Sequence, residues 1–239
     1  MTILITGGSR GLGRALVETL AADPDNQILF TYCHHEDEAQ SLADRFQNVS
    51  ARCVDFCDEE SVKRFAEGLE AEQIDVLINN AYAGNPQGTH FYKSNPDDFA
   101  QAFQTNVMPF IRITQACLKG MRKQKFGKIV NIITSYVIDV PPTGFSAYTA
   151  TKAYIRQLSK SISKELGRFN ITSNCILPDY MQTDFGKVED FQLEQMKDAH
   201  PLKELLKPQD VAEVVASLLK ASQQLNGAEI PINAAQHMF

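Results

Sequence analysis

Two side chains four positions apart could transfer a proton. Tyr148 and Lys152 lie on the same side of a helix if their segment is helical. A tyrosine hydroxyl ordinarily has a pKa of about 10, and a neighbouring ammonium group lowers that pKa by favouring the phenolate. The pair therefore predicts a general acid working near neutral pH, with Tyr148 as the proton donor. A core tyrosine satisfied by one hydrogen bond is the alternative interpretation.

A glycine-rich segment near the start has the residue types needed to bind an anion. The segment reads TGGSRGLG over residues 6–13. Glycines at 7, 11 and 13 permit a tight turn, and the backbone amides of a helix that starts there can approach a pyrophosphate. The pattern alone also fits a plain connection between a strand and a helix.

Short apolar runs alternate with segments of helical period along the whole chain. Strands are expected at Ile3–Thr6, Ile28–Tyr32, Val49–Val54, Val76–Ile78, Ile129–Ile133, Thr172–Ile176 and Ala228–Ile232. Helices are expected at Leu12–Ala22, Glu36–Phe46, Glu59–Glu70, Pro96–Arg122, Tyr148–Arg168 and Pro208–Ser222, with a short one near Phe191–Ala199. Strands joined by right-handed helical crossovers predict an α/β, Rossmann-type doubly wound fold with a mainly seven-stranded parallel sheet and helices on both faces.

The 239 residues suit one domain, 1–239, in which two stretches break the alternation. These stretches, residues 82–95 and 179–207, follow the carboxyl ends of strands, where ligands of such sheets bind, so we expect them to form the substrate loops. A net charge of −6 disfavours nucleic acid as a partner. Five scattered cysteines indicate neither a disulfide framework nor a metal site. With no leader or membrane span in the sequence, we expect a cytoplasmic protein.

Several motifs in order resemble those of the short-chain dehydrogenase/reductase family. The glycine pattern is TGxxxGxG, Asn79-Asn80-Ala81 ends the fourth strand, and Ser135 precedes Tyr148 by thirteen positions and Lys152 by seventeen. The resemblance extends over nearly the whole chain and implies an NAD(P)-dependent oxidoreductase that moves a hydride to or from a carbonyl carbon.

The resemblance also implies a role for each matching position. Tyr148 is the acid, Lys152 holds the nicotinamide ribose, Ser135 binds the substrate oxygen, and Asn106 anchors a relay water. Asn106 could instead brace a helix or strand, and Ser135 could be a turn or cap serine. The residues expected to bind the cofactor are Gly7, Ser9, Arg10, Gly11, Leu12, Gly13, Tyr32, His34, Asp55, Phe56, Asn80, Ala81, Tyr148, Lys152, Pro178, Tyr180 and Thr183.

The end of the second predicted strand bears on the choice of cofactor. An acidic residue there would bind a ribose 2′-hydroxyl and repel a 2′-phosphate, but this chain has Tyr32, followed by Cys33 and His34. Arg10 in the glycine turn would attract the 2′-phosphate. The sequence therefore favours NADP(H) over NAD(H), although His34 and His35 are also typical of exposed loop histidines.

The sequence departs from the family pattern around the nicotinamide. Tyr82 and Asp179 stand where relatives usually have glycine, and Ala234-Ala235 replaces a usual glycine pair. These changes predict weaker cofactor affinity or altered substrate choice. A protein that binds NADP with little turnover, as a scaffold or redox sensor, is therefore the alternative function.

The closest resemblance within the family is to β-ketoacyl-acyl-carrier-protein reductases. Lys128 and Arg168 match positions where those enzymes place cations that dock the acidic carrier protein, although ordinary solvated charges explain them equally well. His90 and His200 are interpreted as plain loop histidines. The substrate is expected to be a small carbonyl compound or a carrier-bound thioester. The two long helices predict a homodimer or homotetramer.

Overall fold

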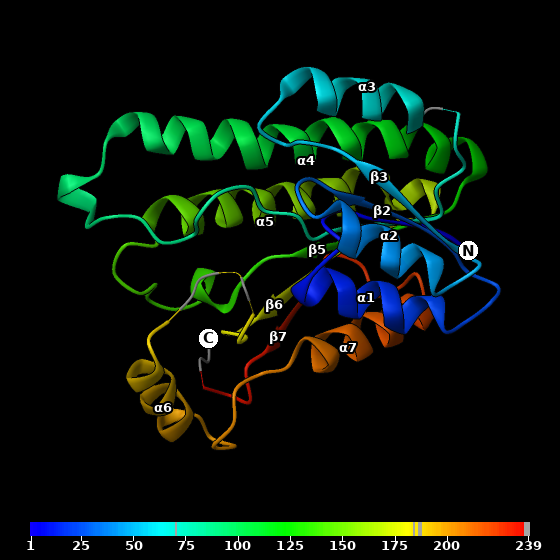
Figure 1. Ribbon diagram of the computed structural model, residues 1–239. Helices are drawn as coiled ribbons and strands as arrows, with labels where there is room; N and C mark the ends of the chain where they lie inside the picture. Colours follow the sequence, from blue (N-terminus) through cyan, green and yellow to red (C-terminus); the bar gives the residue numbers. More distant parts are fainter. Residues whose placement is uncertain (70, 184, 186–187, 237–239) are drawn as a thin grey trace.

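Seven parallel strands form one sheet in the order β3-β2-β1-β4-β5-β6-β7 (Figure 1). The computed structural model describes residues 1–69, 71–183, 185 and 188–236. The strands are β1 (Thr2–Ile5), β2 (Gln27–Tyr32), β3 (Val49–Cys53), β4 (Val76–Asn79), β5 (Gly127–Ile132), β6 (Ile171–Pro178) and β7 (Glu229–Ile232).

Helices cover both faces of this sheet. They are α1 (Gly11–Ala21), α2 (Glu36–Asp44), α3 (Glu59–Leu69), α4 (Pro96–Gln124), α5 (Ser146–Leu166), α6 (Asp190–Ala199) and α7 (Pro208–Lys220), with short 3-10 turns η1 (Phe91–Lys93), η2 (Ser135–Val137) and η3 (Gly167–Phe169). Within the described part of the chain, none of these helices is long and apolar enough to cross a membrane.

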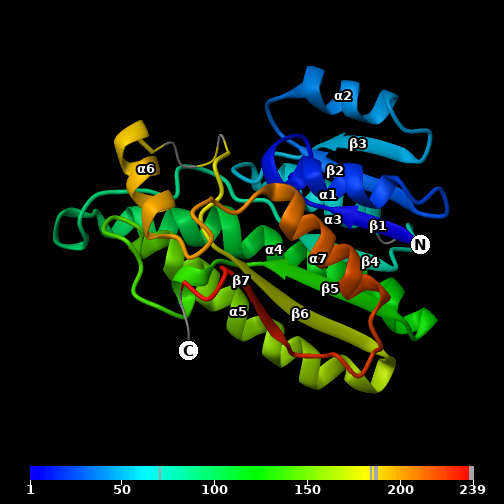
Figure 2. The ribbon, with the colours of Figure 1, turned by 90° about the horizontal axis from the view of Figure 1, so that it is seen from below.

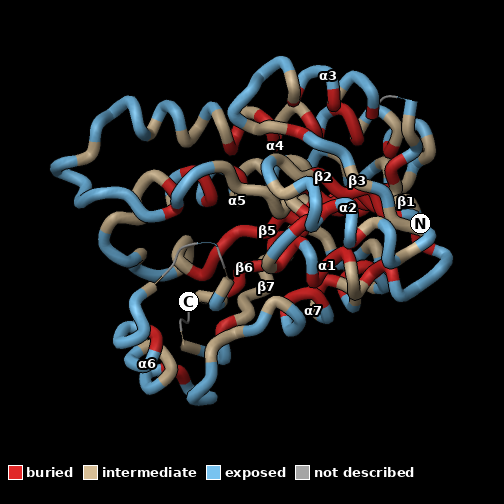
Figure 3. Tube along the Cα trace, viewed as in Figure 1, coloured by how far each residue is buried: buried red, intermediate tan, exposed pale blue. Residues whose placement is uncertain are grey.

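The sheet is buried on both faces because its side chains alternate between two apolar layers (Figure 3). Ile3 and Ile5 of β1 pack into the layer with α1 and α7, whereas Leu4 packs into the layer with α3 and α4. This double burial explains the continuous apolar runs that identify the strands in the sequence.

One crossover differs in hand from the others. From β4 through β6 the chain moves across the sheet with α4 and α5 on one face. The step from β6 to β7 continues in the same direction, but α7 packs beside α1 on the opposite face (Figure 2). The expectation that every crossover is right-handed is therefore wrong for β6-α7-β7, because the apolar face of α7 is buried against α1.

The strands and helices confirm the fold predicted from the sequence, with ends that differ by a few residues. No end differs by more than two residues: α5, for example, begins at Ser146 and ends at Leu166, and β6 continues to Pro178 because Leu177 and Pro178 pair with β7. Glu70, expected to end the third helix, lies outside the described residues.

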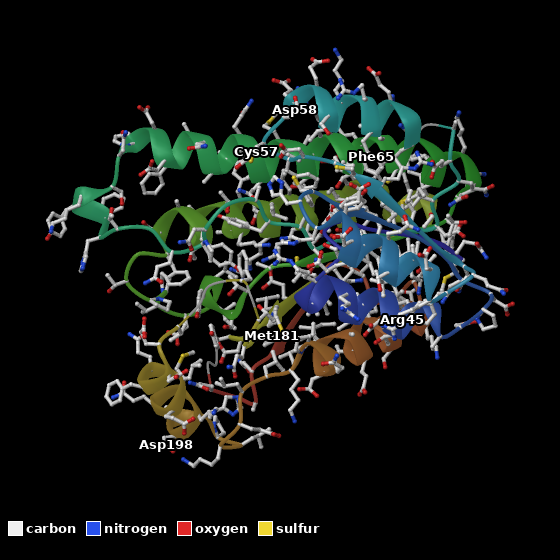
Figure 4. All side chains as sticks on the ribbon, in the orientation of Figure 1. Arg45, Cys57, Asp58, Phe65, Met181 and Asp198 are labelled. Carbon is white, nitrogen blue, oxygen red and sulfur yellow. The ribbon has the colours of Figure 1, made fainter. Side chains whose placement is uncertain are left out.

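The substrate-loop segments gather at the carboxyl edge of the sheet, away from the chain's N-terminus (Figures 1 and 2). In the segment after β6, Met181 forms a bridge with Leu206 and packs against the core (Figure 4). α6 follows, with Asp198 at its outer side in the same figure. Residues 184 and 186–187 of this predicted loop lie outside the described residues.

Ala234 and Ala235 have φ values of 47° and 62°, in the left-handed region that favours glycine. We predict that Ala235→Gly raises the free energy of unfolding by about 1 kcal/mol, because glycine adopts this conformation without a Cβ clash. Urea denaturation measures the change. The matched control is Ala22→Gly, at φ −62°, which should lower stability by roughly 0.5–1 kcal/mol. Equal destabilisation by both variants would contradict the prediction.

Candidate active site

The glycine turn between β1 and α1 has little room for side chains. Gly7 and Gly11 have φ values of 71° and 52°. A Cβ on Gly13 would lie 1.8 Å from the Gly7 carbonyl oxygen, and one on Gly8 would lie 2.5 Å from the Phe30 Cβ and 2.7 Å from its ring. Only glycine fits these positions, so the backbone amides at the start of α1 can approach a bound phosphate closely.

The end of β4 clamps this turn. The Asn80 side-chain amide donates hydrogen bonds to the carbonyls of Thr6 and Gly7 at 3.1 and 2.9 Å. In return, the Thr6 hydroxyl accepts hydrogen bonds from the backbone amides of Asn80 and Ala81. Asn80 and Ala81, both predicted to bind cofactor, therefore lie beside the glycine turn, and Asn80 holds its shape.

The residues expected around the adenosine half follow β2 and β3. Tyr32 ends β2 beside Cys53 of β3, and His34 is exposed, with its ring 3.5 Å from the Cys33 thiol. Asp55 is half-buried just after β3, next to Phe56, and accepts a hydrogen bond from the Cys57 amide at 2.8 Å. Burial, followed by the charge of Glu36, raises the pKa of Tyr32. The carboxylate of Glu36 therefore lies near the end of β2, where a 2′-phosphate is expected.

Tyr148 and Lys152 lie on the buried face of α5. The Lys152 Nζ donates a hydrogen bond to the Ile132 carbonyl at 2.8 Å and lies 5.9 Å from the centroid of the Tyr148 ring. Farther along α5, Ser159 accepts a hydrogen bond from Asn131 of β5 at 3.0 Å. These polar contacts with β5 fix where α5 lies on the sheet.

Burial dominates the protonation of this pair. It raises the pKa of Tyr148 above its usual value, against the effect of a hydrogen bond with Thr134, and it lowers the pKa of Lys152 to about 8. The pKa of Tyr148 is thus raised, not lowered as expected from the neighbouring Lys152, because desolvation of the phenol, only 8% exposed, is the largest effect on it. Tyr148 is consequently protonated, as a proton donor must be.

Three aromatic rings pack around Tyr148. The Tyr82 ring meets it edge-on at 5.0 Å between centroids, and the Phe185 and Phe145 rings lie 6.1 and 6.2 Å away. The Tyr82 ring also lies 5.7 Å from the Lys152 Nζ. The side chain that replaces a family glycine thus packs directly on the predicted catalytic pair.

Ser135 is fully buried at the start of η2, and its partner is another departure from the family pattern. The Ser135 hydroxyl donates a hydrogen bond to Asp179 Oδ1 at 3.1 Å, across 44 positions of sequence. The predicted substrate-binding hydroxyl is therefore directed at a carboxylate.

Asn106 is buried within α4 and holds the segment that follows β4. Its Oδ1 accepts a hydrogen bond from the Ala83 amide at 2.7 Å, and its Nδ2 donates to the carbonyls of Ala83 and Ala102. The side chain is thus used to brace the residue after Tyr82, which matches the bracing alternative considered for it.

The remaining predicted residues lie on the segment after β6. Pro178 ends that strand in the core, and Tyr180 is half-buried. Thr183 crosses over the glycine turn, since a Cβ on Gly11 would lie 3.5 Å from its side chain. Of the four predicted catalytic residues, Ser135, Tyr148 and Lys152 come together at the ends of β5 and α5, and Asn106 contacts the adjoining loop.

A cavity of about 140 Å³ opens beside Ser135. Its walls come from four separate segments, and its lining residues are Tyr136, Val140, Pro142, Asp179, Tyr180, Met196, His200, Leu205 and Gln236. The interpretation of His200 as a plain loop residue is wrong: it is 5% exposed, and its Nδ1 accepts a hydrogen bond from the Leu202 amide. The end of α6 packs this ring inward, for which the sequence holds no signal.

The interpretation of Lys128 as a surface docking cation is also wrong. Lys128 is 8% exposed, and its Nζ donates hydrogen bonds to the carbonyls of Leu219 and Ala221 at 2.8 and 2.6 Å. Carbonyls at the end of a helix attract a cation, so Lys128 stabilises the end of α7. Arg168 is exposed and stacks over Phe169.

Sequence reasoning missed the contacts of Thr134, Tyr136 and His200 with this site. Tyr82 and Asp179 did carry a signal, since both replace usual glycines. The assembled groups provide a protonated phenol, a buried cation near it, a hydroxyl and a carboxylate beside a cavity, next to a turn suited to phosphate. Such a set can protonate or deprotonate an oxygen atom adjacent to a bound dinucleotide.

Comparisons with known proteins agree with this description. The sequence model of the short chain dehydrogenase family matches residues 1–193. The chain is 31% identical to the 3-oxoacyl-[acyl-carrier-protein] reductase FabG of Aquifex aeolicus, over 96% of this chain and 94% of that protein. It is 29% identical to the FabG of Escherichia coli, over 98% and 96%. A crystal structure of a short chain dehydrogenase from Burkholderia cenocepacia in complex with NADP superposes with a TM-score of 0.86 at 26% identity, covering 97% of this chain and 96% of that one.

Gly13→Ala tests the role of the turn. We expect it to abolish NADPH binding and to lower stability by roughly 3 kcal/mol, because the new Cβ would lie 1.8 Å from the Gly7 carbonyl oxygen. Calorimetric titration and urea denaturation provide the two readouts. Gly68→Ala in α3 is the control: its Cβ meets nothing within 4 Å, so it should keep NADPH affinity. Unchanged affinity in Gly13→Ala would show that the turn does not contact the phosphates.

Proposed function

The chain belongs to the short-chain dehydrogenase family, and from that membership we propose that it is an NADPH-dependent carbonyl reductase with Tyr148 as its acid. Family membership makes it an NAD(P)-dependent oxidoreductase acting on CH–OH or C=O groups. The observation that carries the finer proposal is the buried Tyr148–Lys152 pair. Tyr148 has a hydrogen bond with Thr134, the residue before Ser135, and Ser135 donates to Asp179, which lines the cavity.

The residues present fit a dinucleotide at its phosphate end. The turn excludes a Cβ at Gly8 and Gly13, and α1 begins there with Arg10 at its N-cap position. The residues predicted to bind the cofactor would hold the dinucleotide along its length, from this turn to the segment that contains Thr183. At the other end, Tyr82 and Phe185 form an aromatic wall against Tyr148.

A reduced nicotinamide, when bound, supplies the hydride. The side chains of this protein supply the rest. Because burial keeps Tyr148 protonated, its hydroxyl can give its proton to the substrate oxygen. The Lys152 ammonium stabilises the phenolate that this transfer leaves. The Ser135 hydroxyl can donate to the negative charge that develops on the substrate oxygen.

The preference for NADPH is supported by Arg10 and by Tyr32, which stands where an acidic residue would repel a 2′-phosphate. Glu36 near Tyr32 acts in the opposite direction. The balance favours NADPH, since a guanidinium in the turn can pair with the phosphate directly. The NADP complex of the Burkholderia relative agrees with this choice.

The substrate class proposed is a ketone, and the names of the FabG relatives extend it to a 3-oxoacyl thioester on a carrier protein. The burial of Lys128 removes one of the two cations considered for docking such a carrier. We also propose a homodimer or homotetramer paired through the long helices α4 and α5.

A nucleotide-binding protein with little turnover is a second candidate function. The observation that favours it is the packing of Tyr82 and Phe185 on Tyr148, which leaves the phenol 8% exposed. An assay of NADPH oxidation with ketones as substrates separates the two functions.

We expect Tyr148→Phe to lower kcat for ketone reduction at least a hundredfold while NADPH affinity stays within threefold, because only the proton donor is removed. Oxidation of NADPH, followed by its absorbance with a panel of ketones and 3-oxoacyl thioesters, measures kcat. Parallel runs with NADH test the cofactor preference.

Tyr154→Phe is the matched control, since Tyr154 lies on α5 but is 45% exposed and packs on Phe103. It should leave kcat within twofold. No ketone-dependent NADPH oxidation by the wild type would favour the second function, and equal kcat in Tyr148→Phe would remove Tyr148 as the acid.

The pH dependence follows from Lys152. Its pKa of about 8 means that the ammonium is present below pH 8 and lost above it, whereas Tyr148 is protonated throughout. We therefore predict that kcat/KM for reduction is level below pH 8 and falls as pH rises through that pKa. Rates from pH 6 to 10 give the profile. A fall that begins only beyond pH 10 would contradict the assignment to Lys152.

A further inference from the structure

Asp179 places a carboxylate beside the predicted substrate-binding hydroxyl. Its backbone amide continues the pairing of β6 with β7 by donating to the Ile232 carbonyl at 3.1 Å, which fixes the residue at the carboxyl edge of the sheet. Its Oδ1 accepts the Ser135 hydroxyl proton at 3.1 Å. Asp179 is thus held by its backbone with its carboxylate next to the site of reaction.

The Ser135 hydroxyl has one proton to donate. In the structure that proton goes to Asp179, so a substrate carbonyl oxygen that needs it competes with a carboxylate. The carboxylate would also repel the negative charge that develops on the substrate oxygen. Both effects weaken if the substrate brings its own donor to Asp179, because the donor partly offsets the carboxylate charge and Ser135 can then turn its proton to the carbonyl oxygen.

The cavity has the right size and lining for such a molecule. Its volume, about 140 Å³, is close to the roughly 150 Å³ of a cavity that holds benzene, so a compact head group of about six to eight heavy atoms fits. Asp179 lines it together with His200, Gln236 and the phenols of Tyr136 and Tyr180. Burial and then the charge of Asp179 raise the pKa of Tyr136 to about 12, so that phenol stays a donor.

We propose that Asp179 is a specificity-determining residue that selects carbonyl compounds with a hydroxyl or ammonium group on the carbon next to the carbonyl. Oxygens on adjacent carbons are separated by about the distance between Ser135 Oγ and Asp179 Oδ1, so the carbonyl oxygen can face Ser135 while its neighbour donates to Asp179. This inference rests on the proposed carbonyl reductase function.

The reaction balances with groups already named. A hydride from the reduced nicotinamide forms a C–H bond at the carbonyl carbon as the C=O π bond breaks, and the Tyr148 proton forms the O–H bond. The carbonyl compound is reduced to a vicinal diol or amino alcohol, and the nicotinamide is oxidised. The donor held by Asp179 is unchanged.

Matched ligands test the selection on the full chain. The first pair is 2-hydroxycyclohexanone and 2-methylcyclohexanone, and the smaller pair is hydroxyacetone and butanone, each with NADPH. We expect kcat/KM to be at least tenfold higher for the hydroxyl-bearing member of each pair. Calorimetric titration of cyclohexane-1,2-diol and 2-methylcyclohexanol into the protein with NADP⁺ gives a readout independent of turnover, with the same preference expected in Kd.

Three variants locate the effect. Asp179→Gly should reduce the preference to threefold or less, and Asp179→Asn, which keeps the size and an acceptor oxygen, should give an intermediate ratio. Asp198→Asn removes a carboxylate from the outer side of α6, outside the cavity lining, and should leave the ratio unchanged (Figure 4).

Each outcome decides one claim. If both ketones of a pair are reduced equally, or if Asp179→Gly and Asp179→Asn keep the wild-type ratio, the selection by Asp179 is wrong and the reductase function stands. If neither ketone is reduced but the diol binds with a preference that requires Asp179, the selection stands and the reductase function is wrong. If there is neither turnover nor preference, both are wrong.

Discussion

The arrangement of the site depends on one buried hydrogen bond, from the Lys152 ammonium to the Ile132 carbonyl at the end of β5. A charged group in the interior is tolerated only where it is hydrogen-bonded, so this contact, together with the Asn131–Ser159 hydrogen bond, fixes where α5 lies on the sheet. One helical turn away, Tyr148 then lies at the same edge, where it has a hydrogen bond with Thr134, the residue before Ser135. The same burial raises the pKa of Tyr148 and lowers that of Lys152 to about 8, so below pH 8 the pair is present as a phenol and an ammonium group.

The two ends of the site differ in how closely they follow the family pattern. At the phosphate end, the backbone geometry of the turn requires glycine. The Asn80 side chain stabilises the turn by donating hydrogen bonds to two of its carbonyls. At the nicotinamide end, larger side chains replace glycine, and each makes a specific contact. Tyr82 packs on Tyr148, and Asp179 accepts the Ser135 proton.

The long loops at the carboxyl edge give the cavity its individual character. Residues from the segments after β5, β6 and α6 and from the end of the chain line a single small space. Its polar groups come from segments that are distant in sequence, whereas the fold beneath is shared with many relatives. The scaffold therefore fixes the chemistry, and the loops decide which molecule meets it.

The sequence by itself determined the elements, the glycine turn and the Tyr148–Lys152 spacing, because each depends on local periodicity or on contacts within a few residues. Tertiary structure alone decided the environments. Lysine is usually a surface residue, but Lys128 is buried at the end of α7, and His200 is buried at the end of α6. Asn106 braces Ala83, 23 positions away, and Ser135 pairs with Asp179, 44 positions away. Burial and long-range hydrogen bonds of this kind arise only when distant segments pack together. They control protonation states and hydrogen-bond partners, and neither can be inferred from residue types and their spacing.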